Sequence, residues 1–435
     1  MKKLFTCILL LAAVFSAHAQ EEIKKTGLNF GPLPAIGYSS DLGWHYGVLS
    51  DIYWYGDGST YPEYMWKANV EVSRYSKGNT VLHSFFDSKY LIPGLRISAA
   101  ASWFGNKTTN FYGFNGAAST YNPERDGIRD GVGFYLMKRN IFRVQTCLQG
   151  TFGESDWGWA GGLTYWNIKT GHAENKSLSD SDISLYDMYV GAGVIPDAEK
   201  NGGQHLEGKF GVVYDTRDHE NNPTRGTNIE AYFFGSPDII SKHDNSYLKF
   251  AFHFKQFFTL VPERLVFGGH LAYQGLVAGN APYYMLQTIQ SINMKQINTE
   301  GLGSTCTLRG TINNRLQGNG YAWSNFELRW NFVKFRWINQ NWTLATNPFF
   351  DMGMVVQPYR LEQLRTLGLM TGDDIYSGHK EGLHMSAGIG LHVIMNQNFN
   401  INFEFGKAFY DGIRFGYKNN DSTGPGINVG LNYIF

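Results

Sequence analysis

The stretch Asn325-Phe326-Glu327-Leu328-Arg329-Trp330-Asn331-Phe332 decides the fold class, because polar and apolar residues alternate through it without a break. Neighbouring side chains of an extended strand point to opposite faces, so the four polar side chains share one face and the four apolar ones the other. A soluble sandwich would bury the aromatic face in a core. A membrane barrel turns that face to lipid and keeps the polar face wet.

The same separation of faces recurs along the chain, for example in the segments 248–255 and 400–405. Turn clusters separate the alternating segments, and no persuasive amphipathic helix interrupts them. Sixteen strands are therefore predicted, an even number within the range of outer-membrane barrels. The predicted strands are 34–40, 44–55, 65–75, 81–90, 96–104, 131–152, 158–168, 208–215, 226–234, 247–260, 264–274, 323–335, 342–355, 384–395, 399–409 and 427–435.

Turn lengths and composition favour the same all-β transmembrane barrel. Long polar segments such as 105–130 and 169–204 alternate with short turns, which is typical of long extracellular loops and short periplasmic turns. The mature chain has no apolar run near the ~20 residues of a membrane helix. Only a closed barrel could then cross the membrane. A soluble sandwich is disfavoured because the chain is too long for one such domain and shows no linker.

The first residues predict the address of the chain. Lys2 and Lys3 precede an apolar segment, and Ala17-His18-Ala19 has the small-x-small form of a cleavage site. Residues 1–19 are predicted to be a secretory signal peptide, with a retained anchor as the alternative. Residues 20–27 would then form a short periplasmic segment and residues 28–435 the barrel of a bacterial outer membrane.

Composition and motifs give no support for catalysis. The chain carries 37 Lys and Arg against 37 Asp and Glu, so charge gives no argument for a nucleic-acid partner. No His-x-x-x-His pair, phosphate loop or nucleophile–base arrangement occurs, and a non-enzyme without metal or cofactor is expected. The acidic segment 215–226 lacks calcium-loop spacing and is predicted to be a structured turn.

Five motifs, taken in order, resemble the bacterial surface antigen family, the barrel of BamA- and TamA-like outer-membrane assembly proteins. The resemblance begins near residue 28 and covers essentially the whole mature chain. The motifs are Pro32-Leu33-Pro34-Ala35-Ile36-Gly37-Tyr38, Tyr214-Asp215-Thr216-Arg217-Asp218, Asn222-Pro223-Thr224-Arg225-Gly226, Leu308-Arg309-Gly310 and Phe349-Phe350-Asp351-Met352-Gly353.

The resemblance implies that one long loop folds into the lumen and carries the Leu308-Arg309-Gly310 motif at its tip. Arg309 would then pair with Asp351, which shares an inward face with Phe349 and Gly353. Glu327 is a further candidate partner, or simply a lumen charge. Without the resemblance, the alternative for Arg309 is a solvated loop arginine.

The seam between the first and last strands is a second candidate site. Pro32 and Pro34 cannot donate to a ladder, and the predicted first strand, 34–40, is short and contains Gly37. In the last strand, Tyr433 and Phe435 lie on the apolar face, and a terminal aromatic residue resembles the sorting signal of outer-membrane proteins. A weakly bonded seam would suit the lateral gate of the family; alternatively, the prolines only end the pairing.

Departures from the family shape the expected function. Thr311 stands where the family usually has an aromatic residue, and only residues 20–27 precede the barrel, where assembly factors carry POTRA domains. No Gly-x-Ser-x-Gly motif indicates a hydrolase. The expected role is accessory to protein assembly or insertion, with outer-membrane lipid, assembly subunits and client barrels as partners. A pore for small solutes and a surface-loop scaffold are the alternatives.

Overall fold

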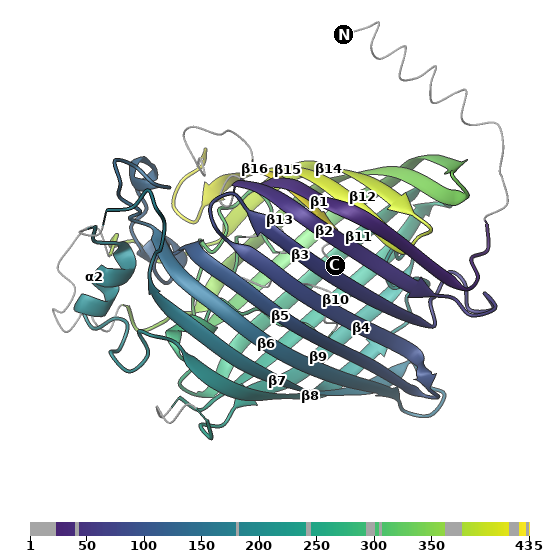
Figure 1. The fold of residues 1–435 in the computed structure, drawn as a ribbon, viewed down its shortest axis with the longest axis horizontal. Coiled ribbons are helices and arrows are strands. Elements are labelled where there is room, and N and C mark those ends of the chain that lie inside the picture. The colour runs from purple at the N-terminus through teal and green to yellow at the C-terminus, as the bar shows by residue number, and fades with distance from the viewer. Residues whose placement is uncertain are drawn as a thin grey trace, which may run out of the picture.

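The computed structural model describes residues 23–39, 43–179, 182–240, 245–292, 301–303, 307–361, 376–416, 426–431 and 435. The predicted signal peptide and Tyr433 lie outside these residues. Sixteen antiparallel strands form one sheet in which each strand pairs with its neighbours in sequence (Figure 1). This meander confirms the predicted barrel architecture and strand number.

The first eight strands are β1 (Leu28–Ser39), β2 (Gly43–Trp54), β3 (Trp66–Tyr75), β4 (Thr80–Ile92), β5 (Leu95–Asn110), β6 (Leu136–Thr151), β7 (Trp157–His172) and β8 (Gly203–Asp215). The last eight are β9 (Gly226–Ser236), β10 (Tyr247–Val261), β11 (Leu265–Gly279), β12 (Gly320–Trp337), β13 (Gln340–Gln357), β14 (His384–Met395), β15 (Phe399–Asp411) and β16 (Gly426–Leu431). Short helices lie in the loops: η2 (Gly116–Ala118), η3 (Pro123–Arg125), α2 (Leu185–Gly191) and η4 (Tyr283–Met285).

Departures from the predicted elements include β1 and the loop 169–204. β1 has twelve residues and is not short, because it continues in register with β2 through both prolines. The loop 169–204 contains α2, which begins at a capping box formed by Ser184 and Asp187. With seven residues, α2 is too short to show a helical period in the sequence. Among the described residues, no helix has the length and apolar character needed to cross a membrane.

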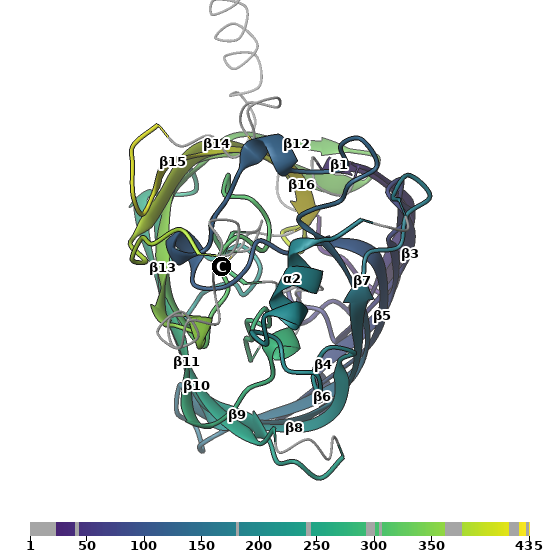
Figure 2. The same cartoon turned by 90° about the vertical axis from the view of Figure 1, so that its left-hand side faces the viewer.

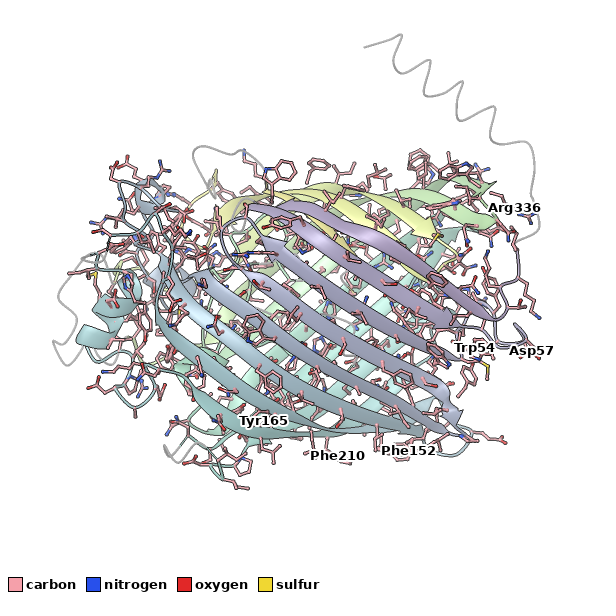
Figure 3. The ribbon with its side chains drawn as sticks, in the orientation of Figure 1. Trp54, Asp57, Phe152, Tyr165, Phe210 and Arg336 are labelled. Atoms are coloured by element: carbon pink, nitrogen blue, oxygen red, sulfur yellow. The ribbon has the colours of Figure 1, made fainter. Side chains whose placement is uncertain are left out.

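Burial follows the alternation that the sequence shows. In β12, Glu327 and Arg329 are 1% and 2% exposed, whereas Trp330, on the other face of the strand, is 50% exposed. Trp54, Phe152 and Phe210 likewise project from the outside of the sheet (Figure 3). A polar interior and an aromatic exterior reverse the arrangement of a soluble protein and match a barrel in lipid.

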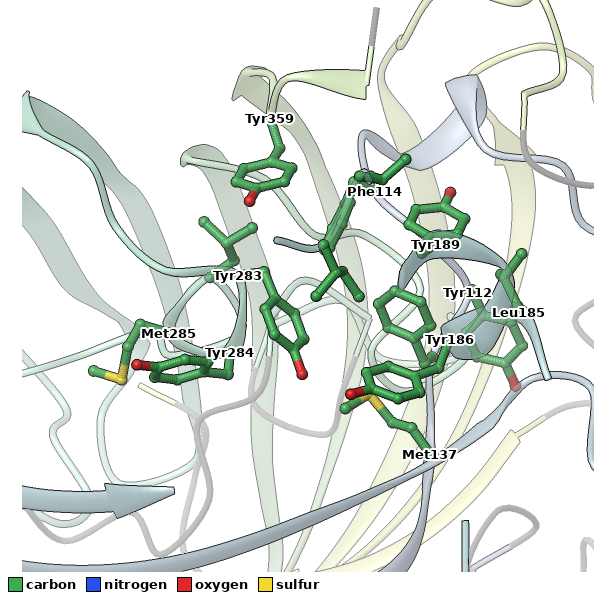
Figure 4. Close-up of a cluster of buried hydrophobic side chains, with 14 of the residues drawn as sticks. Tyr112, Phe114, Met137, Leu185, Tyr186, Tyr189, Tyr283, Tyr284, Met285 and Tyr359 are labelled. Carbon is green, nitrogen blue, oxygen red and sulfur yellow. The ribbon is translucent and has the colours of Figure 1, made fainter. Parts of the chain in front are cut away.

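The loops at one end form an aromatic dome, defined here by the buried side chains of residues 111–137, 185–195, 281–286 and 359–361. Viewed from this end, loop segments lie within the ring of strands (Figure 2). Phe114 contacts Tyr189 of α2 with ring centroids 5.4 Å apart, and Tyr359 at 4.6 Å (Figure 4). Buried aromatic contacts of this kind hold several loops together as one packed unit.

The opposite end carries a turn cap, defined by residues 55–64, 219–221 and 396–398. Glu220 of the β8–β9 turn accepts from Arg96 Nη2 at 2.9 Å and lies 3.2 Å from Lys89 Nζ. Asn221 Nδ2 donates to Asn398 Oδ1 of the β14–β15 turn at 2.8 Å. The cap therefore links turns that start from distant parts of the wall.

The β8–β9 connection is the structured turn that the sequence predicts. Asp218 Oδ1 accepts from the backbone N–H of Thr224 at 2.9 Å, and Asp218 Oδ2 accepts from the Thr224 hydroxyl. Arg217 forms a bidentate pair with Asp215, at 2.8 Å from Nε and 2.6 Å from Nη2. These bonds fix the base of the turn that carries Glu220 into the cap.

Candidate functional site: the lumen latch and the seam

The connection between β11 and β12 folds back into the lumen and buries its Arg309 side chain completely. Leu308 anchors the loop in an apolar cluster with Leu302, Leu316 and Tyr321. Gly310 has φ of 82°, a left-handed conformation that glycine adopts without strain, and it turns the chain directly after the arginine. The tip is therefore held from both sides.

Arg309 and Asp351 form the contact that the resemblance implies. Arg309 donates to Asp351 Oδ2 from its backbone N at 3.0 Å and from Nε at 2.8 Å, and to Oδ1 from Nη2 at 2.8 Å. The guanidinium carbon lies 3.7 Å from the ring centroid of Phe349, close enough for a cation–π contact. Gly353 lies on the same inward face, against Trp323, where a Cβ atom would stand 2.9 Å from that side chain.

Two further carboxylates bind the same guanidinium. Arg309 Nη1 donates to Glu327 Oε1 of β12 and, at 2.9 Å, to Glu404 Oε1 of β15. Glu404 is absent from the sequence-based set, although its strand's alternation places it on the inward face. No local signal joins it to Arg309, since the two residues meet only through the closure of the wall. One side chain thus clamps β12, β13 and β15 to the loop.

Arg329 extends the cluster by one cation. Its Nε donates to Glu327 Oε2 at 2.8 Å, and its Nη2 donates to the backbone oxygen of Phe435 at 3.0 Å. The latch network, defined as Arg309, Glu327, Arg329, Asp351 and Glu404, is buried throughout. Buried charges are stable only when they are paired and hydrogen-bonded, so loss of one member destabilises the others.

Glycine contacts place the loop tip beside the last two strands. A Cβ atom on Gly310 would stand 2.4 Å from the backbone of Gly406, and Ala408 N donates to Gly310 O at 3.1 Å. A Cβ atom on Gly426, the first residue of β16, would lie 3.6 Å from Gly310 Cα. Thr311 closes the tip by donating its backbone N–H to Leu308 O at 3.2 Å. The latch therefore sits against β15 where β16 begins.

The seam joins β1 and β16, which lie side by side (Figure 1). Gly27 O accepts from Tyr55 N at 2.9 Å, and the β1–β2 register runs unbroken through Gly37, which pairs with His45. Backbone groups of alternate residues point to opposite edges of a strand. Gly27 bonds to Tyr55, the residue after β2, so the odd-numbered residues of β1 face β2 and the even-numbered ones, including Pro32 and Pro34, face β16. The edge of β1 that faces β16 therefore lacks two N–H donors.

Phe435 lies in a different place from the one predicted. The alternation predicts this ring on the outer face of a last strand that runs to residue 435; the structure describes β16 over Gly426–Leu431. Phe435 is 8% exposed, stacks on Phe257 and His270 at 6.0 and 5.3 Å, and lies under the Arg329 guanidinium at 5.0 Å. These partners belong to the inward face, and the cation–π contact stabilises the ring there.

Comparisons with known proteins agree with this geometry. Residues 66–435 match the Omp85 superfamily domain. Among solved structures, BamA from Haemophilus ducreyi lacking POTRA domains 1–3 is similar, with 16% identity and a TM-score of 0.51 over 94% of this chain and 69% of that chain. CdiB from Escherichia coli is similar with 11% identity and a TM-score of 0.57, over 95% of this chain and 65% of that chain.

The family model identifies the superfamily, and the solved structures identify the fold. A search of the curated proteins found no match. At these identities the solved structures show a shared barrel fold alone, and this chain spans less than two thirds of the CdiB chain. The family match covers most of the chain and includes the latch loop and every strand from β3 onward. The chain belongs to the Omp85 superfamily, as a sixteen-stranded barrel of the bacterial outer membrane.

Proposed function

We propose that this barrel is an accessory subunit in the assembly or insertion of outer-membrane proteins, acting at its seam while its lumen stays closed. The observation that supports this proposal is the position of the latch: Gly310 packs against Gly406 beside Gly426, the first residue of β16. The loop that fills the lumen thus contacts the strand that forms one side of the seam. This role requires no catalytic group, metal or cofactor.

The seam is the part of the wall that costs least to open. A backbone hydrogen bond contributes about 0.5–1.5 kcal/mol net. Pro32 and Pro34 remove two donors from the β1 edge, so fewer bonds resist separation there than between paired strands. An opened edge presents unpaired backbone groups to which a client strand can add. The partners of this function are outer-membrane lipid, other assembly subunits and client barrels.

In this proposal the latch keeps the rest of the wall rigid. Arg309 ties β12, β13 and β15 together. β16 takes no part in these ion pairs, and movement is proposed to concentrate there. The proposal also takes residues 1–19 as a cleaved signal peptide, residues 20–27 as a periplasmic segment and residues 28–435 as the barrel.

A pore for small solutes is the competing function, and the packing of the interior argues against it. The aromatic dome lies at one end, the turn cap at the other and the latch loop between them. A surface-loop scaffold would use the outside of the dome alone and would not need the latch. Conductance in planar bilayers separates the pore from the other two.

The deciding experiment locks the seam in cells. One cysteine is placed in β1 and one at a facing position of β16, in a chain whose Cys147 and Cys306 are replaced by serine. Depletion of the native protein should lower the levels of other outer-membrane barrels in a membrane proteome. The oxidised pair should fail to restore them, and the reduced pair or either single cysteine should succeed. Unchanged barrel levels on depletion would contradict the assembly role.

A further inference from the structure

The hairpin formed by β12 and β13 extends past its neighbour at the end of the short turns. The last β11–β12 pair is Leu265 with Trp330, and Asn331 N donates to Arg264 O at 2.7 Å. β12 nevertheless continues to Trp337 (Figure 1, the green hairpin at the upper right). The edge of residues 332–337, called the β12 edge below, has no strand partner on the β11 side within the described part of the chain.

The other side of this segment is well ordered by pairing. β12 pairs with β13 from Val333 with Leu344 to Trp337 with Gln340. The connecting residues Ile338 and Asn339 both have positive φ, 50° and 53°, as a type I′ turn requires. The β12 edge therefore belongs to a formed hairpin, and its free N–H and C=O groups are held in strand geometry.

A bulge determines which side chains border this edge. The register shifts between Asn331 and Val333, so the parity of the faces reverses there. Phe335 and Trp337 fall on the outer face, where Phe335 stacks on Trp342 with ring centroids 6.3 Å apart and Trp337 lies tilted against the same ring at 6.1 Å. The two residues that alternate with them, Lys334 and Arg336, fall on the opposite face.

Charge and exposure distinguish this edge. Lys334 has 52% of its side chain exposed and reaches one carboxylate, Glu263, at 3.2 Å. Arg336 is exposed and projects at the same end of the molecule (Figure 3). A strand lying along this edge would meet two cations on one face and two aromatic side chains on the other.

We propose that the β12 edge is a docking site for an extended, acidic segment of a partner protein, which adds to the sheet as a further strand. Its carboxylates would face Lys334 and Arg336, and its alternate apolar side chains would lie beside Phe335 and Trp337. Lipid headgroups can pair with the two cations, but they cannot satisfy a row of alternating N–H and C=O groups. The site is separate from the seam and does not depend on the proposed function.

The test uses the full barrel in nanodiscs and a synthetic probe, an N-acetylated and C-amidated heptapeptide in which Glu alternates with Val. Hydrogen exchange of the amides of residues 332–337 is measured with and without the probe. Amides of this segment that pair with β13 are protected in every sample. We expect the amides that face the open edge to exchange fast alone and slowly with the probe. The same peptide with alternate backbone nitrogens methylated keeps the charge but cannot add as a strand, and it should give no protection. A peptide in which Lys replaces Glu should not bind.

Variants separate the edge from general charge. Lys334→Glu with Arg336→Glu should weaken binding of the Glu–Val probe at least tenfold, while Lys107→Glu with Arg129→Glu, at the loop end, should leave it unchanged. Both pairs are checked for folding by their heat-dependent shift in electrophoresis. Equal binding of methylated and unmethylated probes would overturn strand addition. Protection of the edge-facing amides in nanodiscs without any probe would show that the edge is already covered and would equally overturn the proposal.

Discussion

Arg309 and Asp351 share three hydrogen bonds across the lumen, two from the guanidinium and one from the backbone of Arg309. The backbone bond means that the loop tip itself, and not only a flexible side chain, is fixed to β13. A substitution that keeps the charge of residue 309 but shortens its planar fork would therefore lose part of the contact.

Removal of Arg309 should destabilise the barrel strongly. Arg309→Ala leaves Asp351, Glu327 and Glu404 buried without their shared cation, and breaking a buried pair costs about 3–5 kcal/mol. Thermal unfolding in detergent, followed by heat-modifiable electrophoresis, measures the loss. Arg414→Ala, at an exposed ion pair, is the matched control and should change stability by less than about 0.5 kcal/mol.

Direct pairing can be tested by exchanging the two charges. Arg309→Asp should be more damaging than Arg309→Ala because it adds a fourth carboxylate to the cluster. The double variant Arg309→Asp with Asp351→Arg should recover part of the loss. Recovery remains partial because Glu327 and Glu404 then face an aspartate across the lumen. A double variant no better than Arg309→Asp alone would contradict direct pairing.

Substitution of Gly310 should displace the loop tip without touching a charge. Gly310→Ala puts a Cβ atom 2.4 Å from Gly406, a contact that backbone cannot accommodate without moving. Gly153 has a similar φ, 62°, but open space around it. Gly153→Ala should cost only the strain of a left-handed residue, about 1–2 kcal/mol. Limited proteolysis of the loop should rise in Gly310→Ala alone; equal sensitivity in both variants would contradict the tight contact.

The aromatic dome at one end and the turn cap at the other predict a stepwise opening to ions. Deletion of residues 307–319 should raise the conductance of the barrel only modestly, because the turn cap remains. Adding Glu220→Ala, which removes one carboxylate partner from both Arg96 and Lys89, should give a larger and stable conductance. Planar-bilayer recordings of the wild type and the two variants measure the steps. A large conductance in the wild type would favour the solute pore.

Acid should loosen the β8–β9 turn through Asp218. Burial alone would raise the pKa of this carboxyl, but hydrogen bonds from Thr224 and Arg225 lower it below its ordinary value. Because the pKa is lower in the folded turn, ionised Asp218 stabilises the turn at pH values above the ordinary pKa of about 3.9. This stabilisation is lost as the pH falls through the lower pKa of the folded state. Amide exchange of Thr224 and Arg225, corrected for intrinsic rates, should accelerate below about pH 4. Asp218→Asn should remove this acid dependence.

Much of the barrel could be predicted because its rule is local. Alternation with period two reports the inward and outward faces of each strand directly, so Asp351 and Glu327 were placed in the lumen from sequence. The partner of Arg309 came from a motif and not from the pattern. Alternation states which face a residue occupies but gives no distance around the wall.

The residues that could not be predicted are those that depend on tertiary contacts. Glu404 joins the latch because the curved sheet brings β15 within reach of the loop tip that β12 also contacts. Phe435 turns inward because Arg329 and Phe257 offer a stacked site that sequence does not display. Helix α2 depends on packing against the dome rather than on its own seven residues. A bulge such as the one after Asn331 moves the residues that follow it to the opposite face of the strand, and no residue type in the sequence marks it.

The span of the Arg309 contacts has a consequence for the order of biogenesis. Arg309 lies between β11 and β12, but its partners include Asp351 and Glu404, and Gly310 packs against Gly406. Contacts between residues distant in sequence form after local ones, because the intervening chain must first be ordered. The latch can therefore close only after β15 has joined the wall. Its closure would mark the end of insertion, and a chain arrested earlier would keep an open, protease-sensitive loop.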